Sequence, residues 1–118
     1  MINSYKELTV WQKSIDLVEK TYKFSEKMPK EELYNLTNQM RRAVISIPSN
    51  IAEGYRRNHT AEYKHFLGIA RGSAAELDTQ FVLVKRLYPK IDLIETENLL
   101  FEVQKMLSSM IKTLNPKP

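Results

Sequence analysis

The sequence has no cysteine, and only 3 glycines occur among its 118 residues. The absence of cysteine excludes disulfide bonds, thiolate metal sites and cysteine nucleophiles, and it fits a reducing compartment. Three glycines are too few to build a Gly-rich phosphate loop of the Rossmann or Walker type. No run approaches the roughly 18 apolar residues of a membrane span, and residues 1–10 contain no apolar signal segment. We therefore expect a cytoplasmic protein that does not enter a membrane.

Groups suited to catalysis or metal binding are also scarce. The two histidines, His59 and His65, are six residues apart, which is about 240° around a helix, so they do not share a face. Glu62 and His65 form one Glu-x-x-His pattern, whereas di-iron bundles need two such patterns and two further inward glutamates. We expect no enzymatic activity, no metal, no cofactor and no small-molecule substrate.

The residues that are abundant favour helix. Leu, Lys, Glu and Met lose little rotamer freedom in a helix, and apolar residues recur at spacings of three and four. This periodicity predicts four helices, over about 9–28, 31–53, 60–87 and 92–114. Short connections force neighbouring helices to run antiparallel. The sequence thus predicts an all-α fold, a left-handed up-down-up-down four-helix bundle forming one domain over 1–118, with frayed ends at 1–8 and 115–118.

Local signals give the expected helix ends and contacts. Thr60 is predicted as the N-cap of the third helix, and Gly54 as the residue just beyond the end of the second. Leu33 is expected in the core stripe of the second helix. Gly72 lies inside the third helix, where glycine costs about 1 kcal/mol relative to alanine. We expect a close approach of another helix to compensate for that cost.

Two apolar patterns are more extensive than the core of a monomeric bundle can bury. Trp11, Ile15, Val18 and Tyr22 form a second stripe on the first helix, beside its main core stripe. Residues 43–47 are apolar nearly all round, and such a helix must be covered on every side. These patterns predict a subunit interface. The residues expected at that interface, or in structural roles, are Ile45, Ile47, Pro48, Asn50, Glu53, Gly54, Gly72, Ser73 and Glu76.

The net charge of +4 arises within residues 41–71. This segment contains six basic residues and only two acidic ones, Glu53 and Glu62. Five of the six basic residues are arginines, which bind phosphate or carboxylate in a bidentate manner. One interpretation is a surface that binds polyanions through counterion release. The other is that arginines pair with Glu53 or Glu76 in structural salt bridges. The candidate nucleic-acid-binding residues are Arg41, Arg42, Arg56, Arg57, Lys64 and Arg71.

Four motifs carry a resemblance to a known family: Leu8-x-Val10-Trp11-Gln12-Lys13, Gln39-x-Arg41-Arg42-Ala43, Ser46-Ile47-Pro48-Ser49-Asn50-Ile51-Ala52-Glu53-Gly54, and Glu62-x-x-x-Phe66-Leu67-x-Ile69-Ala70-x-Gly72-Ser73-x-x-Glu76-Leu77. With them the chain resembles the four-helix-bundle proteins encoded within intervening sequences of bacterial 23S ribosomal RNA genes. Asn35 departs from the family pattern, in which a glycine follows the tyrosine.

The resemblance implies an antiparallel four-helix bundle that assembles as a ring-shaped homopentamer. It also points to a similar accessory protein of diversity-generating retroelements, which binds nucleic acid and the reverse transcriptase. For this chain it implies that Arg41, Arg42, Arg56 and Arg57 form a basic surface. We therefore expect a non-enzymatic oligomer that binds RNA or other nucleic acid. The alternative is a protein-interaction scaffold without nucleic-acid binding.

Overall fold

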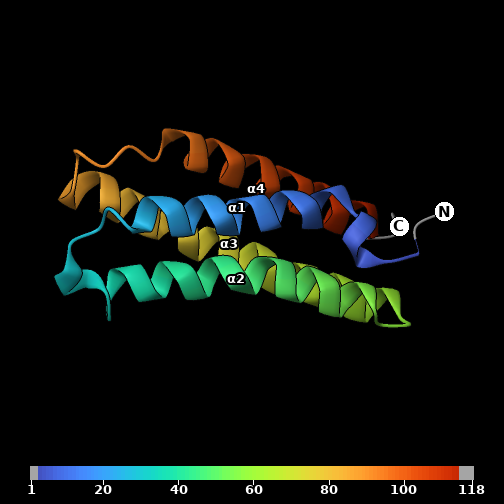
Figure 1. The fold of residues 1–118 in the computed structure, drawn as a ribbon. Coiled ribbons are helices and arrows are strands. Elements are labelled where there is room, and N and C mark those ends of the chain that lie inside the picture. The colour runs from blue at the N-terminus through green and yellow to red at the C-terminus, as the bar shows by residue number, and fades with distance from the viewer. Residues whose placement is uncertain (1–2, 115–118) are drawn as a thin grey trace.

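The computed structural model describes residues 3–114, which fold into four α-helices without a β-strand (Figure 1). The predicted all-α class and the four helices are confirmed. The colours in Figure 1 show that the chain reverses direction from each helix to the next. The handedness of the bundle stays a prediction. The elements are η1 (Tyr5–Glu7), α1 (Thr9–Ser25), η2 (Lys30–Glu32), α2 (Leu36–Tyr55), α3 (Thr60–Leu87) and α4 (Ile94–Leu114).

The four helices pack in a closed ring. Each helix contacts the next one along the chain, and α1 contacts α4 to close the arrangement. The α2–α3 contact is the most extensive of the four. In this order the seam between α1 and α2 and the seam between α3 and α4 lie on opposite sides of the bundle.

The core is built from one apolar stripe of each helix, as the three-and-four spacing predicts. The stripes meet along the bundle axis and exclude water from their largest side chains. In α3 the buried stripe ends at Val84, and Leu87 in the last turn is 58% exposed. Buried residues of the four stripes include Leu17 of α1, Met40 and Ile51 of α2, Leu67, Ala74 and Phe81 of α3, and Leu100 and Leu107 of α4.

The connection before α2 differs from the prediction. The second helix begins at Leu36 rather than near Glu31, because residues 30–32 form the short helix η2. The Glu32 carboxylate accepts hydrogen bonds from the backbone N–H of Leu36 at 3.4 Å and from the Asn35 side chain at 3.3 Å. These contacts fix a turn there. Leu33 is consequently 43% exposed and not part of the core.

The N-terminal segment is better ordered than predicted. Residues 3–8 are not frayed: the Ser4 hydroxyl accepts a hydrogen bond from the Lys6 N–H, and the Glu7 carboxylate accepts from the N–H groups of Asn3 and Ser4. This reciprocal arrangement is a capping box. The predicted fraying of residues 1–2 and 115–118 lies outside the described residues. At the start of α3, His59 is the N-cap and Thr60 is the first helical residue.

Gly54 and Gly72 both differ from their predicted roles. Gly54 lies inside α2, not beyond its end, and it is buried against α3. A Cβ atom there would lie 2.8 Å from the Phe66 Cβ atom and 3.2 Å from the Tyr63 carbonyl oxygen. Gly72 is exposed, and apart from its own stretch of helix no atom of the described chain lies within 4 Å of a Cβ placed there. The close helix approach therefore occurs at Gly54, and its prediction at Gly72 is wrong within the chain.

A hydrogen bond ties η2 to the end of α3 and predicts a pH-dependent stability. The Tyr88 hydroxyl donates to the Glu32 carboxylate, and this bond raises the pKa of Tyr88 to about 12. An unfolded tyrosine titrates near pH 10. The folded-state pKa is the higher one, so the stabilisation is complete below pH 10 and is lost as the pH rises towards 12.

Replacing Tyr88 by phenylalanine is expected to lower the melting temperature at pH 7–9, and this difference is expected to shrink between pH 10 and 12. Thermal melts followed by circular dichroism test this. Tyr34→Phe is the matched control, because Tyr34 is 91% exposed and is expected to show no such difference. A Tyr88→Phe deficit that is the same at pH 8 and pH 12 would contradict the assignment.

Candidate functional site

Arg41 is engaged within the chain. Its Nε atom donates a hydrogen bond of 3.1 Å to the Ser25 hydroxyl oxygen, and its guanidinium carbon lies 4.8 Å from the centre of the Tyr22 ring. Both partners belong to α1, so Arg41 links α2 to α1. A cation over an aromatic ring is stabilising in itself. The structure thus gives Arg41 an internal structural contact.

Arg57 is engaged in the same way at the other end of α2. Its guanidinium nitrogens lie 3.7 Å from Glu53 and 3.8 Å from Glu62, and its guanidinium carbon lies 5.0 Å from the centre of the Phe66 ring. Glu62 and Phe66 belong to α3. Arg57 therefore holds the α2–α3 connection, and the ion-pair partner of Glu53 within the chain is Arg57 rather than Arg41 or Arg42.

Arg42, Arg56 and Arg71 are exposed, and none makes an ion pair with another of the described residues. Arg42 lines a shallow hollow together with Ser73 and Glu76 of α3. Arg71 precedes Ser73 by two residues, about 200° around α3, so it points away from α2. Lys64 is half-buried on α3.

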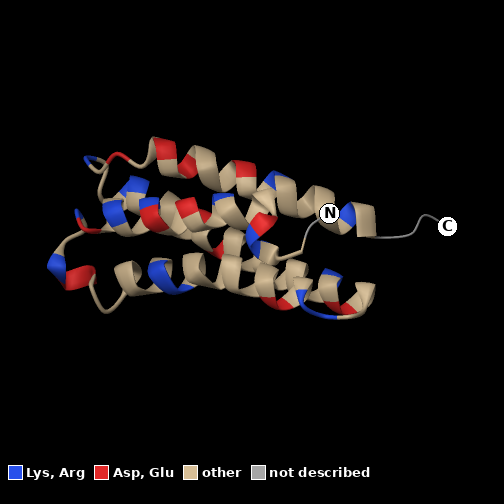
Figure 2. Cartoon of the chain, turned by 45° about the vertical axis from the view of Figure 1, so that its right-hand side comes forward, with Lys and Arg blue, Asp and Glu red and all other residues tan. Residues whose placement is uncertain are grey.

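The six predicted basic residues therefore do not form one patch. Arg41 contacts α1 and Arg57 contacts α3. Arg42 and Arg56 are exposed to solvent, and Arg71 lies on the side of α3 that points away from α2. Figure 2 shows the same at the level of the whole molecule, with Lys and Arg distributed along the bundle and interspersed with Asp and Glu. Neighbours in sequence are separated here because successive residues of a helix point about 100° apart.

Asn50 and Ser73 take part in the α2–α3 contact. The Ser73 hydroxyl lies 2.9 Å from the Ser46 hydroxyl, and the Asn50 side chain donates to the Ser46 hydroxyl at 2.9 Å and to the Ser46 carbonyl at 2.8 Å. Ile47 is completely buried in the core. Three residues predicted for an interface, Ile47, Asn50 and Ser73, therefore make contacts within the chain. Glu76, also predicted there, is exposed beside Arg42.

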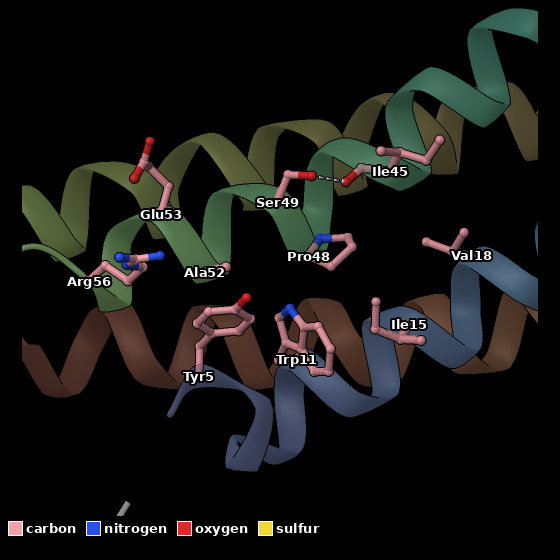
Figure 3. Close-up of a pocket in the computed structure, with 10 residues that line it drawn as sticks. All are labelled: Tyr5, Trp11, Ile15, Val18, Ile45, Pro48, Ser49, Ala52, Glu53 and Arg56. Carbon is pink, nitrogen blue, oxygen red and sulfur yellow. Dashed lines mark hydrogen bonds between the residues drawn. The ribbon is translucent and has the colours of Figure 1, made fainter. Parts of the chain in front are cut away.

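Three further members of the predicted interface, Ile45, Pro48 and Glu53, line a groove between α1 and α2 (Figure 3). The groove has a volume of about 520 Å³ and is open to solvent. In Figure 3 the side chains of Trp11 and Ile15 face Pro48 and Ala52 across it, whereas the Glu53 carboxylate points away. Its lining comprises Tyr5, Trp11, Ile15 and Val18 from η1 and α1, and Ile45, Pro48, Ser49, Ala52, Glu53 and Arg56 from α2.

The groove is apolar and only partly covered by the chain. Ile45 is 43% exposed, and Tyr22, which follows Val18 by one turn of α1, is 37% exposed. The Ser49 hydroxyl donates to the Ile45 carbonyl at 2.9 Å, so its polar group is satisfied within the helix. Trp11 is held at one end by an edge-to-face contact with Tyr5, with ring centres 5.4 Å apart. The second stripe of the first helix thus lies along an open surface.

Sequence reasoning missed part of this lining. Tyr5 was assigned to a frayed segment, although its capping box (Ser4 and Glu7) is visible in the sequence. Ala52 and Ser49 carry no signal of their own, because small residues say little about which face of a helix is covered. The stripe containing Trp11 did indicate the correct face of α1.

Within residues 3–114, no group of three or more His, Cys, Asp or Glu side chains is arranged to hold a metal ion. None of the described helices combines the length and the apolar character required to cross a membrane. Burial raises the pKa of Tyr63, which packs edge-to-face against Tyr55, with a smaller contribution from Tyr55 itself. These two rings lie at the α2–α3 connection and not in the lining of the groove.

Comparison with protein families gives one match, which covers residues 6–109: the family described as 23S rRNA-intervening sequence protein. The chain belongs to this family. The match includes α1, α2 and α3 completely and most of α4, so the groove lies almost wholly within the family's shared sequence.

A solved structure that is similar to this chain has the same fold. It is a protein of unknown function from the S23 ribosomal protein family of Bacteroides thetaiotaomicron, with a crystal structure at 1.70 Å resolution. The two chains are 26% identical and superpose with a TM-score of 0.78, over 88% of this chain and 99% of the relative. No curated protein matches the sequence.

The adjacent arginines Arg41 and Arg42 are expected to differ in their effect on stability. Arg41→Gln removes the contacts with Tyr22 and Ser25 and is expected to lower the free energy of unfolding by about 1 kcal/mol. Arg42→Gln is the matched control, and a change within about 0.5 kcal/mol is expected for an exposed side chain. Urea unfolding of both variants measures the difference. Equal losses in the two variants would show that the Arg41 contacts contribute nothing of their own.

Proposed function

We propose that this protein is a non-enzymatic helical bundle that self-associates through the α1–α2 groove and serves as a protein-interaction scaffold. The observation that carries the proposal is the apolar lining of that groove, in which stripes from two helices face each other and are only partly covered by the described chain. Contiguous exposed apolar surfaces on soluble proteins mark interaction sites.

The composition of the groove fits a protein partner. Trp, Tyr and Arg dominate the energetics of protein interfaces, and Trp11, Tyr5 and Arg56 lie together at one end. The middle of the groove is aliphatic, which suits an apolar helix surface that docks by excluding water. The ion pairs of Arg57 and the cation–π contact of Arg41 also support the scaffold proposal over nucleic-acid binding. They engage two of the candidate arginines in contacts within the chain.

Light scattering over a dilution series tests self-association, and the fluorescence of the single tryptophan reports on the groove. We expect a molar mass several times 13.8 kDa at high concentration, with five copies as the assembly that the resemblance implies. Because Trp11 lines the groove, its emission should shift to longer wavelength as the assembly dissociates. A mass of 13.8 kDa at every concentration would overturn the proposal.

Nucleic-acid binding is a second candidate, favoured by one observation: Arg42, Arg56 and Arg71 are exposed without an ion pair among the described residues, in a chain of net charge +4. Binding of this kind is electrostatic and weakens steeply with salt. If it occurs, a mixed RNA pool should co-elute with the protein at low salt and separate at high salt. Replacing the three arginines by glutamine should then reduce both the affinity and its salt dependence. If the elution volume of the protein is unchanged by RNA at both salt concentrations, nucleic-acid binding is excluded.

A further inference from the structure

A second apolar surface lies between α3 and α4. Phe101 is 62% exposed, Ile94 is 66% exposed and Val82 is 40% exposed. A salt bridge of 2.6 Å between Lys85 of α3 and Glu97 of α4 fixes the register of the two antiparallel helices. Val82 is one turn from Lys85, and Phe101 is one turn from Glu97 in the corresponding direction. Val82 and Phe101 therefore lie next to each other on the outer side of this seam, and Ile94 lies about two turns before Phe101 on α4.

This surface lies on the opposite side of the bundle from the groove. The helices pack in the ring order α1, α2, α3, α4, so the α1–α2 seam and the α3–α4 seam are opposite edges. One edge is hollowed and the other presents an aromatic ring, of which Lys105 covers one face at 5.3 Å. A concave apolar surface and a projecting apolar surface on opposite edges are complementary between two copies of one chain.

The two edges also carry one pair of opposite charges, although Lys105 adds a positive charge beside Phe101 on the α3–α4 edge. Arg56 at the end of the groove makes no ion pair with a described residue. Asp78 lies one turn before Val82 on α3 and likewise makes no ion pair among residues 3–114. A copy docked by its α3–α4 edge brings a carboxylate near a groove that carries a free guanidinium.

We propose that the α3–α4 edge around Phe101 occupies the α1–α2 groove of a second copy, so that the copies associate head to tail. This inference rests on the proposed function, which assigns self-association to the groove, and it names the surface that fills the groove. Such a contact is heterologous: every copy uses two different surfaces, and the chain of contacts either closes into a ring or extends as a filament.

Mixing two variants, each blocked at one surface, tests the pairing directly. Ile45→Glu places a charge in the groove, and Phe101→Glu places one on the opposite edge. Both side chains are substantially exposed, so neither change removes a core contact, and circular dichroism checks that both variants fold. Each variant alone is expected to be monomeric. Their equimolar mixture is expected to give a heterodimer of twice the monomer mass, because the intact edge of the Ile45→Glu chain fits the intact groove of the Phe101→Glu chain.

The outcomes separate this inference from the proposed function. A Phe101→Glu protein that assembles like the wild type overturns the head-to-tail pairing and leaves the groove as an interface of another symmetry. A mixture that stays monomeric also overturns the pairing, since both required surfaces are then present but do not bind. An Ile45→Glu protein that assembles like the wild type overturns the proposed function itself. Val82→Glu is a second edge variant and should behave like Phe101→Glu.

Discussion

Gly54→Ala is expected to lower the free energy of unfolding by about 1–3 kcal/mol, the usual cost of overpacking. Helix propensity alone predicts the opposite sign, because alanine is the better helix former by about 1 kcal/mol. Gly54 also has no positive φ that would require glycine. The loss comes from the new methyl group, which would lie 2.8 Å from the Phe66 Cβ atom and 3.1 Å from the Tyr63 ring. Both neighbours belong to α3, so the two helices must move apart.

Gly72→Ala provides the matched control. Gly72 also lies inside a helix, but apart from its own stretch of helix no atom of the described chain lies within 4 Å of its added methyl group. This variant is expected to raise the free energy of unfolding by about 0.5–1 kcal/mol, through helix propensity alone. Urea unfolding of both variants at one protein concentration measures the pair. Two changes of the same sign would contradict the packing described at Gly54.

Ile45→Glu is expected to weaken self-association by about 100-fold or more. A carboxylate placed in a desolvated interface without a partner costs several kcal/mol, and about 2.8 kcal/mol corresponds to a factor of 100. The fold of the single chain should persist, because Ile45 is 43% exposed and outside the core. Sedimentation velocity over a concentration series measures the change.

Ile69→Glu controls for the introduction of a charge as such. Ile69 has nearly the same exposure, 39%, but it lies on α3 beside Lys64 and His65, away from the groove. Its replacement should leave the association unchanged. If the two variants weaken association equally, the effect is one of net charge, and the groove has no special role.

Much of the fold could be predicted because it follows from apolar periodicity. The stripes that contain Leu17, Ile51 and Leu107 are buried as expected. The beginning of α2 could not be predicted, because the acids before it stabilise a turn through Glu32 rather than the first turn of the helix. Acidic residues favour both arrangements, and only the contact of Glu32 with Tyr88, 56 residues later, distinguishes them.

The candidate site could be predicted in part. The reasoning that an apolar segment around Ile45 must be covered pointed to the side of α2 that lines the groove, and the Trp11 stripe pointed to the facing side of α1. The arginine cluster could not be resolved in the same way, since charge counted along the sequence does not say which side chains point together. Arg41 and Arg42 are adjacent in sequence, yet one contacts α1 and the other lies near α3.

α2 combines these roles along a single helix. One side contributes Met40 and Ile51 to the core, and the side towards α3 is fixed by Gly54 and by the Ser46 hydrogen bonds. The side towards α1 contributes Pro48 and Ile45 to the groove. The motif of the resemblance at residues 46–54 therefore lies on a helix that is in contact on three sides.

The most direct measurement of groove occupancy uses the absence of cysteine, because a single introduced thiol can be labelled alone. Ser49→Cys places it in the groove, and Thr60→Cys places it at the exposed start of α3. We predict that alkylation of Cys in the Ser49→Cys protein slows as the protein concentration rises through assembly, whereas the Thr60→Cys rate stays constant. An assembled Ser49→Cys protein that is alkylated as fast as the dissociated one would contradict self-association through the α1–α2 groove.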